Sequence, residues 1–358
     1  RGVVTKLTRR HLLTTTGIAA LAGCTGGRSG SETFPRPLEL PTAGEGLPLP
    51  TEPAALRDEV RSGGPSKDGI PSIDEPSFIA PDAVDFLDPG DPVFGVASDG
   101  ATKAYPQKIL VAHEIVNDDL DGTPVSVTYC PLTGTVQGFY RGNTEFGVSG
   151  RLINANLVMY DRTTEAWWPQ ILATAIPGPW NENPEIRSLR EFRLIWTTWG
   201  QWREHHPDTK VLSTDTGHAR NYGRDPYGSY NPRGGYYDSE TMLFPGRIED
   251  DRYHPKRVVM GARTAEGAAA FLKTALRDDR VMTGEIGDMA VTAVYDSRYD
   301  TAYVYRNPNE QPVSAADGDI AVDGSTYAPD SLPLSRIHTF DAMWFAWVGY
   351  YPETTGYD

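Results

Sequence analysis

Apolar and polar residues alternate over much of the chain, and the alternating stretches come in pairs joined by short turns. A period of two is typical of strands that bury one face. Asp-Gly dipeptides at 99–100 and 121–122 favour the tight turns of β-hairpins. The predicted hairpins are 92–98 with 101–106, 114–120 with 123–130, 136–141 with 144–149, 157–162 with 166–170, 291–296 with 301–306, and 319–322 with 325–328.

Helical periodicity is confined to a few segments. Residues 264–278 carry apolar side chains at helical spacing and are predicted to form a helix. A second helix is predicted over 194–205. It is expected to end there, because the residue before Pro207 avoids helical geometry. The aromatic segment 340–350 fits a helix or a strand. No internal repeat is apparent. The sequence predicts a β-rich α+β fold, mainly antiparallel sheet built from hairpins, in a single globular domain over 61–358.

Residues 1–23 have the pattern of an export signal. Arg9 and Arg10 precede a short uncharged stretch that ends in Leu-Ala-Gly before Cys24. This stretch is shorter than the roughly 20 residues that span a bilayer, and small residues before a cysteine are typical of lipoprotein processing. We expect twin-arginine export, lipidation of Cys24 and anchoring to the outer face of the cytoplasmic membrane. Residues 24–60, rich in Gly, Ser and Pro, are predicted to form a flexible lipid-anchored tether.

The charge of the chain narrows the classes of partner. Its formal net charge is −15, and no run of Lys or Arg stands out, which argues against a nucleic-acid partner. The acidic residues are dispersed, and Arg outnumbers Lys among the basic ones. Such a surface stays hydrated in concentrated salt, so a halophilic source is one hypothesis, and an ordinary acidic secreted protein is the alternative.

The most informative chemistry surrounds Cys130, the one thiol that remains if Cys24 carries lipid. With 121–122 as a two-residue turn, His113 falls directly opposite Cys130, and opposed Cβ atoms lie roughly 4.5–5.5 Å apart. Alternation places both side chains on the more polar face of the hairpin and points Glu114 the other way, unless a bulge intervenes.

Three interpretations of this pair remain open. His113 draws the proton from Cys130 and makes it a nucleophile. Alternatively, both side chains bind copper or zinc, with His218, His254 or an acidic residue as a further ligand. In the third interpretation, Cys130 is a small buried apolar residue without chemistry.

Weaker candidates for ligand binding lie on neighbouring segments. Tryptophans at strand spacing are more often part of a core than of a binding surface, and the arginine among these candidates is expected to hold a carboxylate of the fold. The candidates are Asn117, Thr128, Tyr129, Arg162, Trp167 and Gln170.

The order of several short motifs resembles one uncharacterised family, domain of unknown function 3179. The motifs are Asp68-Gly69-Ile70-Pro71, Ala104-Tyr105-Pro106, His113-Glu114-Ile115-Val116-Asn117-Asp118, Thr128-Tyr129-Cys130-Pro131-Leu132, Leu157-Val158-Met159-Tyr160-Asp161-Arg162, and Trp167 with Gln170. The resemblance runs from about Asp68 to near Tyr350 and implies an exported, often lipid-anchored domain, without an established reaction. Many relatives look like Cys-Pro-Leu-Cys where this chain ends the motif in Thr133, so a dithiol pair is not available here.

Together, these observations predict an extracytoplasmic, lipid-anchored domain with a candidate metal or thiol site at Cys130 and His113. Its expected partner is the membrane, and copper or zinc is the candidate cofactor. A surface protein that binds a small ligand or a partner without catalysis is the first alternative, and a structural envelope component is the second.

Overall fold

The computed structural model describes residues 40–98 and 100–358. The predicted export signal, Cys24 and the first part of the predicted tether lie outside these residues. The folded unit extends further toward the N-terminus than residue 61, because Leu40 and Leu56 are buried and Thr42 forms a β-bridge with Leu189. Within the described ranges, no helix is long and apolar enough to cross a membrane.

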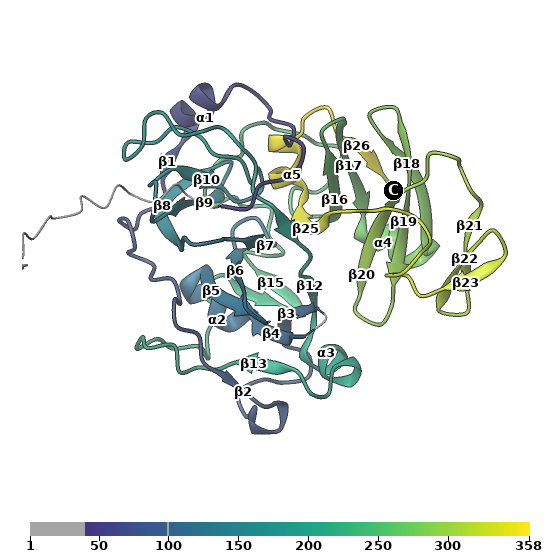
Figure 1. The fold of residues 1–358 in the computed structure, drawn as a ribbon, viewed down its shortest axis with the longest axis horizontal. Helices are drawn as coiled ribbons and strands as arrows, with labels where there is room; N and C mark the ends of the chain where they lie inside the picture. Colours follow the sequence, from purple (N-terminus) through teal and green to yellow (C-terminus); the bar gives the residue numbers. More distant parts are fainter. Residues whose placement is uncertain (1–39, 99) are drawn as a thin grey trace, which may run out of the picture. The chain divides into compact units, whose positions relative to one another are not determined.

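Strands dominate the fold, and most of them follow one order of elements that occurs twice (Figure 1). The first repeat consists of β3 (Pro92–Ala97), β4 (Thr102–Pro106), α2 (Gln107–His113), β5 (Ile115–Leu120), β6 (Thr123–Cys130), β7 (Thr135–Tyr140), β11 (Glu191–Phe192), β12 (Ile195–Thr198), α3 (Trp199–His205) and β13 (Lys210–Leu212). The second consists of β16 (Val258–Thr264), β17 (Gly267–Leu272), α4 (Lys273–Asp279), β18 (Val281–Ile286), β19 (Met289–Asp296), β20 (Thr301–Arg306), β24 (Arg336–Ile337), β25 (Thr339–Met343), α5 (Trp344–Tyr350) and β26 (Thr355–Tyr357).

Both repeats build the same two sheets. The order β12-β3-β4-β13 in the first repeat corresponds to β25-β16-β17-β26 in the second, and β11-β7-β6-β5 corresponds to β24-β20-β19-β18. In these two sheets β13 and β26 run parallel to β4 and β17, and the other pairs that both repeats share are antiparallel. Both repeats belong to one compact unit.

The registers of the two repeats also agree. Ile115 pairs with Thr128 in the first repeat, and Val281 pairs with Val294 in the second. From β3 to β7 in the first repeat and from β16 to β20 in the second, equivalent positions are therefore 166 residues apart in the sequence (115 to 281). Identical pairing at every shared strand shows that the resemblance is an internal duplication of structure and not a coincidence of topology.

One packing device is kept in both repeats. A Cβ atom on Gly95 of β3 would lie 2.2 Å from the ring of Trp202, and one on Gly261 of β16 would lie 2.2 Å from the ring of Trp347. The indole nitrogen of each tryptophan donates a 3.0 Å hydrogen bond to a threonine seven residues later. A glycine in the strand thus lets the helix of each repeat pack closely on its sheet.

The repeats differ in the segment inserted into the second sheet. This segment lies between β7 and β11 in the first repeat and between β20 and β24 in the second. The first carries β8 (Phe146–Ile153), β9 (Asn156–Asp161) and β10 (Trp167–Pro169), which form a sheet with β1 (Arg61–Ser62). The second carries a separate three-stranded sheet of β21 (Val313–Ala316), β22 (Asp319–Val322) and β23 (Ser325–Tyr327).

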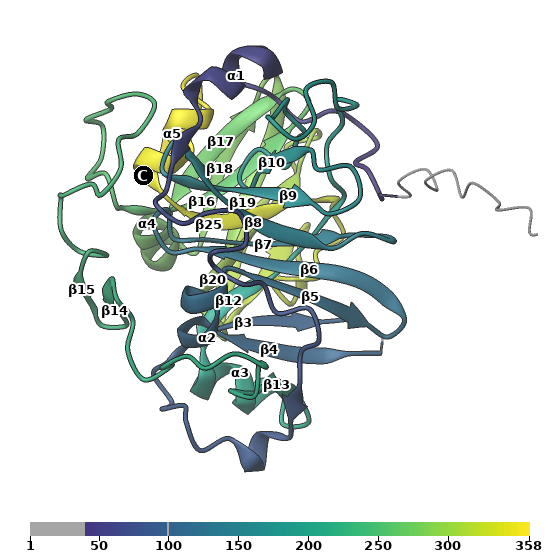
Figure 2. The same ribbon diagram turned by 90° about the vertical axis from the view of Figure 1, so that its left-hand side faces the viewer.

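The remaining elements connect or flank the repeats. A long linker with the hairpin β14–β15 joins the repeats and runs along the outside of the fold (Figure 2). These elements are α1 (Pro53–Glu59), β2 (Phe78–Ile79), the short 3-10 helix Pro81–Ala83, β14 (Gly228–Tyr230) and β15 (Arg233–Gly235).

The predicted fold class is confirmed, and most of the predicted hairpins form. The hairpin of 136–141 with 144–149 was wrong, because β7 and β8 enter different sheets. The helix over 264–278 is also wrong for most of its length: most of its apolar residues belong to β17, and only the part in α4 is helical. Segment 340–350 contains both a strand and a helix. The expectation of no internal repeat is overturned.

Candidate functional site

The hairpin expected to carry the site forms with the predicted register, but it stops short of His113. Ile115 opposes Thr128 as expected. Helix α2 ends at His113, and Glu114 has a positive φ of 59°, which breaks the alternation that a strand would impose. His113 therefore does not occupy the ladder position opposite Cys130.

His113 is held by other partners. Its Nδ1 lies 2.7 Å from the carbonyl oxygen of Pro71, and its Nε2 lies 2.7 Å from the hydroxyl of Tyr222. Its ring packs against that of His218 at a centroid distance of 5.3 Å. Burial lowers the pKa of His113, so the buried imidazole is neutral at neutral pH, with both nitrogens engaged.

Cys130 lies in an apolar core and is 1% exposed. Its Sγ is 3.8 Å from the carbonyl oxygen of Ala155. Burial, and then the nearby carboxyl of Glu114, raise the pKa of the thiol to about 11. These surroundings favour the thiol over the thiolate, the opposite of what an activated nucleophile needs.

Glu114, and not His113, is the group whose charge acts on the thiol of Cys130. The side chain is partly buried, and within the described structure its carboxyl forms no hydrogen bond or ion pair. Burial raises its pKa to about 8, and its charge also acts on Tyr227. A positive φ at the helix end is what turns this side chain inward, and no pattern of alternation could show it.

The predicted metal site does not assemble in the part of the chain that the structure describes. There, no three His, Cys, Asp or Glu side chains are grouped so that they could hold a metal ion. Cys130, His113 and His218 accordingly do not form a common ligand set.

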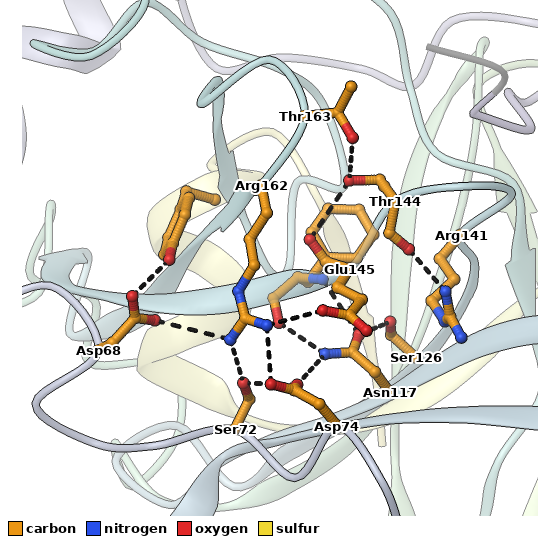
Figure 3. Close-up of polar contacts among 12 residues, drawn as sticks. Asp68, Ser72, Asp74, Asn117, Ser126, Arg141, Thr144, Glu145, Arg162 and Thr163 are labelled. Atoms are coloured by element: carbon orange, nitrogen blue, oxygen red, sulfur yellow. Dashed lines mark hydrogen bonds and ion pairs between the residues drawn. The ribbon is translucent and has the colours of Figure 1, made fainter. Parts of the chain in front are cut away.

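Arg162 is the centre of a polar network at the surface (Figure 3). One terminal nitrogen, Nη1, lies 2.7 Å from Asp74 and 2.7 Å from Glu145. The other, Nη2, donates to Ser72 at 2.8 Å. Asp74 in turn accepts a 2.7 Å hydrogen bond from Asn117. The expectation that Arg162 holds a carboxylate of the fold is confirmed, and Asn117 belongs to the same structural network.

The other weak candidates are parts of the core. Gln170 is buried and bonds to Thr128 with its amide nitrogen (3.0 Å) and to Thr135 with its amide oxygen (2.6 Å). Trp167 is buried against Trp180. Tyr129 packs against Phe94 and Trp196 in the core of the first repeat.

A cavity of about 510 Å³ lies between the two repeats and the linker that joins them. Trp196 and Thr198 of β12 line one side, Tyr230 of the linker lines another, and β25 and α4 of the second repeat close it. Its size is that of a pocket for a small organic ligand. We call it the repeat-junction cavity.

Charged side chains are concentrated in the repeat-junction cavity. Three carboxylates line it, Asp238, Asp300 and Asp341. Five positively charged side chains line it as well, although the whole chain has a net charge of −15. They are Arg233, Lys256, Arg257, Lys273 and Arg277. Of the lining residues, only His254 is a candidate from the sequence, because these side chains come from segments far apart in the chain.

The charged side chains that line the cavity lie in the second repeat and in the linker. They are not features that both repeats share. Lys273 begins α4, where the first repeat begins α2 with Gln107. Asp341 opposes Met260 in the ladder, at the position that Trp196 holds in the first repeat. The framework of the two repeats is thus alike, and the polar groups that face the cavity are not.

Comparison with known proteins gives one match. A family model described as "Protein of unknown function (DUF3179)" matches residues 67–354, most of the chain. No significant match is found among curated proteins or among solved structures.

Proposed function

We propose that this chain, which belongs to the DUF3179 family of proteins of unknown function, is a binding protein for a small polar ligand. The proposal selects the binding alternative over a thiol or metal reaction. The observation that carries it is the repeat-junction cavity, whose volume of about 510 Å³ is that of a site for a small molecule and whose charged lining suits a polar one.

Two further features support a binding role. The walls of the cavity are well-ordered elements: Trp196 lies in β12, Lys273 begins α4, and Asp341 lies in β25. A site built on strands and helix ends keeps its shape when empty, which lowers the entropic cost of binding. Cys130 and Glu114 are not among the residues that line this cavity, so the buried thiol takes no part in the proposed function.

The proposed location is the one expected from residues 8–24. A lipid on Cys24 would hold the binding domain at the outer face of the cytoplasmic membrane, where it meets small molecules from the surroundings. Replacing Cys24 with Ser should release the protein from the membrane fraction, and retention of the variant would count against the anchor.

Thermal unfolding in the presence of a panel of small molecules tests the binding function. The panel contains organic acids, phosphate, neutral amides, sugars and polyamines, each at a concentration well above its expected dissociation constant. A ligand at 100 times its dissociation constant adds about 2.7 kcal/mol to the stability of the folded state. At least one class should raise the melting temperature of the full chain.

A cavity-filling variant shows whether such a ligand occupies the repeat-junction cavity. Thr198 is half-buried on its wall, and Thr198→Trp places an indole where the ligand would lie. Binding should be lost in this variant and kept in a matched Thr214→Trp variant, since Thr214 is exposed and is not among the lining residues. If no class of the panel shows a shift that depends on position 198, the proposed function is wrong.

A further inference from the structure

The positively charged side chains of the repeat-junction cavity fall into two groups. Lys273 donates a 2.7 Å hydrogen bond to Asp341 and lies 3.8 Å from Asp300. Arg277 binds Asp300 at 2.8 Å. Two positive charges therefore face two carboxylates on the α4 side of the cavity. This side is neutral as a whole.

The second group is Arg233, Lys256 and Arg257, and no carboxylate pairs with any of them within the described residues. Arg233 donates from Nη1 to the backbone carbonyl of Lys256 at 3.0 Å. Its Nε and Nη2 are buried and have no hydrogen-bond partner. These two atoms lie on one edge of the guanidinium, so this edge of the positive charge has no acceptor from the protein.

Lys256 is almost completely buried, with 1% exposed. Its ammonium donates to the carbonyl oxygens of Tyr236 and Thr241 and lies 3.5 Å from the centre of the Tyr236 ring. Burial, and then the positive charge of Arg233, lower its pKa to about 8. Two neighbouring positive charges without a carboxylate are costly where they are buried, and a bound anion would lower that cost.

Arg257 and Asp238 complete this side of the cavity, and both are exposed. With three positive charges and one negative, this side has a net charge of +2. The rest of an acidic protein repels anions, so an anion would be drawn to this group of charges in particular.

From this arrangement we infer that the ligand of the repeat-junction cavity carries an oxyanion, a carboxylate or a phosphate group, which Arg257 binds, with the charges of Arg233 and Lys256 behind it. The inference rests on the proposed function and names the chemical class of its ligand.

The test measures binding of matched probes to the full chain by calorimetry at fixed ionic strength. Succinate and inorganic phosphate represent the two sources of an oxyanion, succinamide is the neutral analogue of succinate, and putrescine is the cation. We expect succinate or phosphate to bind, succinamide and putrescine to bind much more weakly, and Thr198→Trp to abolish binding. Binding of only one of the two anions identifies the source.

Two variants locate the anion. Arg257→Gln should weaken binding of the anion by roughly ten-fold or more, the cost of a lost charge-assisted hydrogen bond. Arg233→Gln should weaken it as well, because it removes a nearby positive charge. Arg203→Gln is the matched control, since Arg203 is exposed on α3 and is not among the lining residues. Arg257→Gln replaces an exposed side chain, so it tests the inference even if Arg233→Gln disturbs folding.

The outcomes separate the inference from the proposed function. Suppose that a neutral or cationic probe binds, that Thr198→Trp abolishes this binding, and that Arg233→Gln and Arg257→Gln leave it unchanged. The inference is then wrong, and the proposed binding function stands. Anion binding that survives Thr198→Trp overturns the inference as well, because the anion then lies elsewhere. If Thr198→Trp blocks none of the probes and no member of the wider panel, both fail.

Discussion

Replacement of Glu114 by Gln should change how the stability of the protein depends on pH. The carboxyl has a pKa of about 8 in the folded chain against 4.5 for the ordinary side chain, and burial is the cause. Between these two values the unfolded chain has released the proton and the folded chain has kept it. Raising the pH therefore favours unfolding, and the free energy of unfolding falls as pH rises through this window.

The size of the effect follows from the shift. Each pH unit within the window is worth about 1.4 kcal/mol. Summed from about pH 5 to about pH 8, with the folded group half ionised at the upper end, Glu114 lowers the free energy of unfolding by roughly 3 to 4 kcal/mol. The amide of the Glu114→Gln variant cannot ionise, so the variant loses this contribution while keeping a side chain of nearly the same shape.

Urea unfolding of wild type and Glu114→Gln at a series of pH values measures this difference. Subtracting the two curves cancels the other titrating groups, such as His113 and His338, whose pKa values are lowered and which oppose the trend. Glu185→Gln is the matched control, because that side chain is 75% exposed and its replacement should give a flat difference. A flat difference for Glu114→Gln too, or one of opposite slope, would refute the reasoning.

Three further predictions concern other parts of the molecule. Cys130 should react with iodoacetamide only as fast as the protein unfolds, because the thiol is 1% exposed and its pKa is raised to about 11; rapid labelling of the folded chain, followed by mass spectrometry, would contradict this. Gly95→Ala and Gly261→Ala should each destabilise the protein by about 1–3 kcal/mol in urea unfolding, because the new methyl group meets a tryptophan ring at 2.2 Å. Gly44→Ala is the control: its methyl group has nothing within 4 Å, so it should be neutral. Binding of succinate should weaken as pH rises above about 8, since Lys256 loses its charge there, and titration of a Lys256→Met variant at the same pH values should show no such loss.

Local patterns predicted much of the sheet structure. Asp121-Gly122 and the alternation on either side of it placed the pairing of Ile115 with Thr128 correctly, because turn and register are linked over a few residues. The same pattern gave a wrong prediction for the residues just before Ile115. Helix α2 is only seven residues long, too short for a periodicity to stand out, and it removed His113 from the ladder.

The duplication was invisible for a different reason. The repeats share positions more than residues: Cys130 corresponds to Asp296, and Gln107 corresponds to Lys273. Because their insertions differ in length, the sequence distance between equivalent strands also changes after β7 and β20. The repeat-junction cavity depends on this arrangement, since Trp196 and Asp341 meet there only after both repeats have folded. No local signal connects such residues.

The unequal segments 141–190 and 307–335 leave and re-enter the two repeats at the same place, between equivalent strands. That junction holds two different segments without altering the pairing around it, so it tolerates extra sequence. A fluorescent reporter spliced between Asp317 and Gly318, in the turn joining β21 to β22, would lie outside the strands that both repeats share.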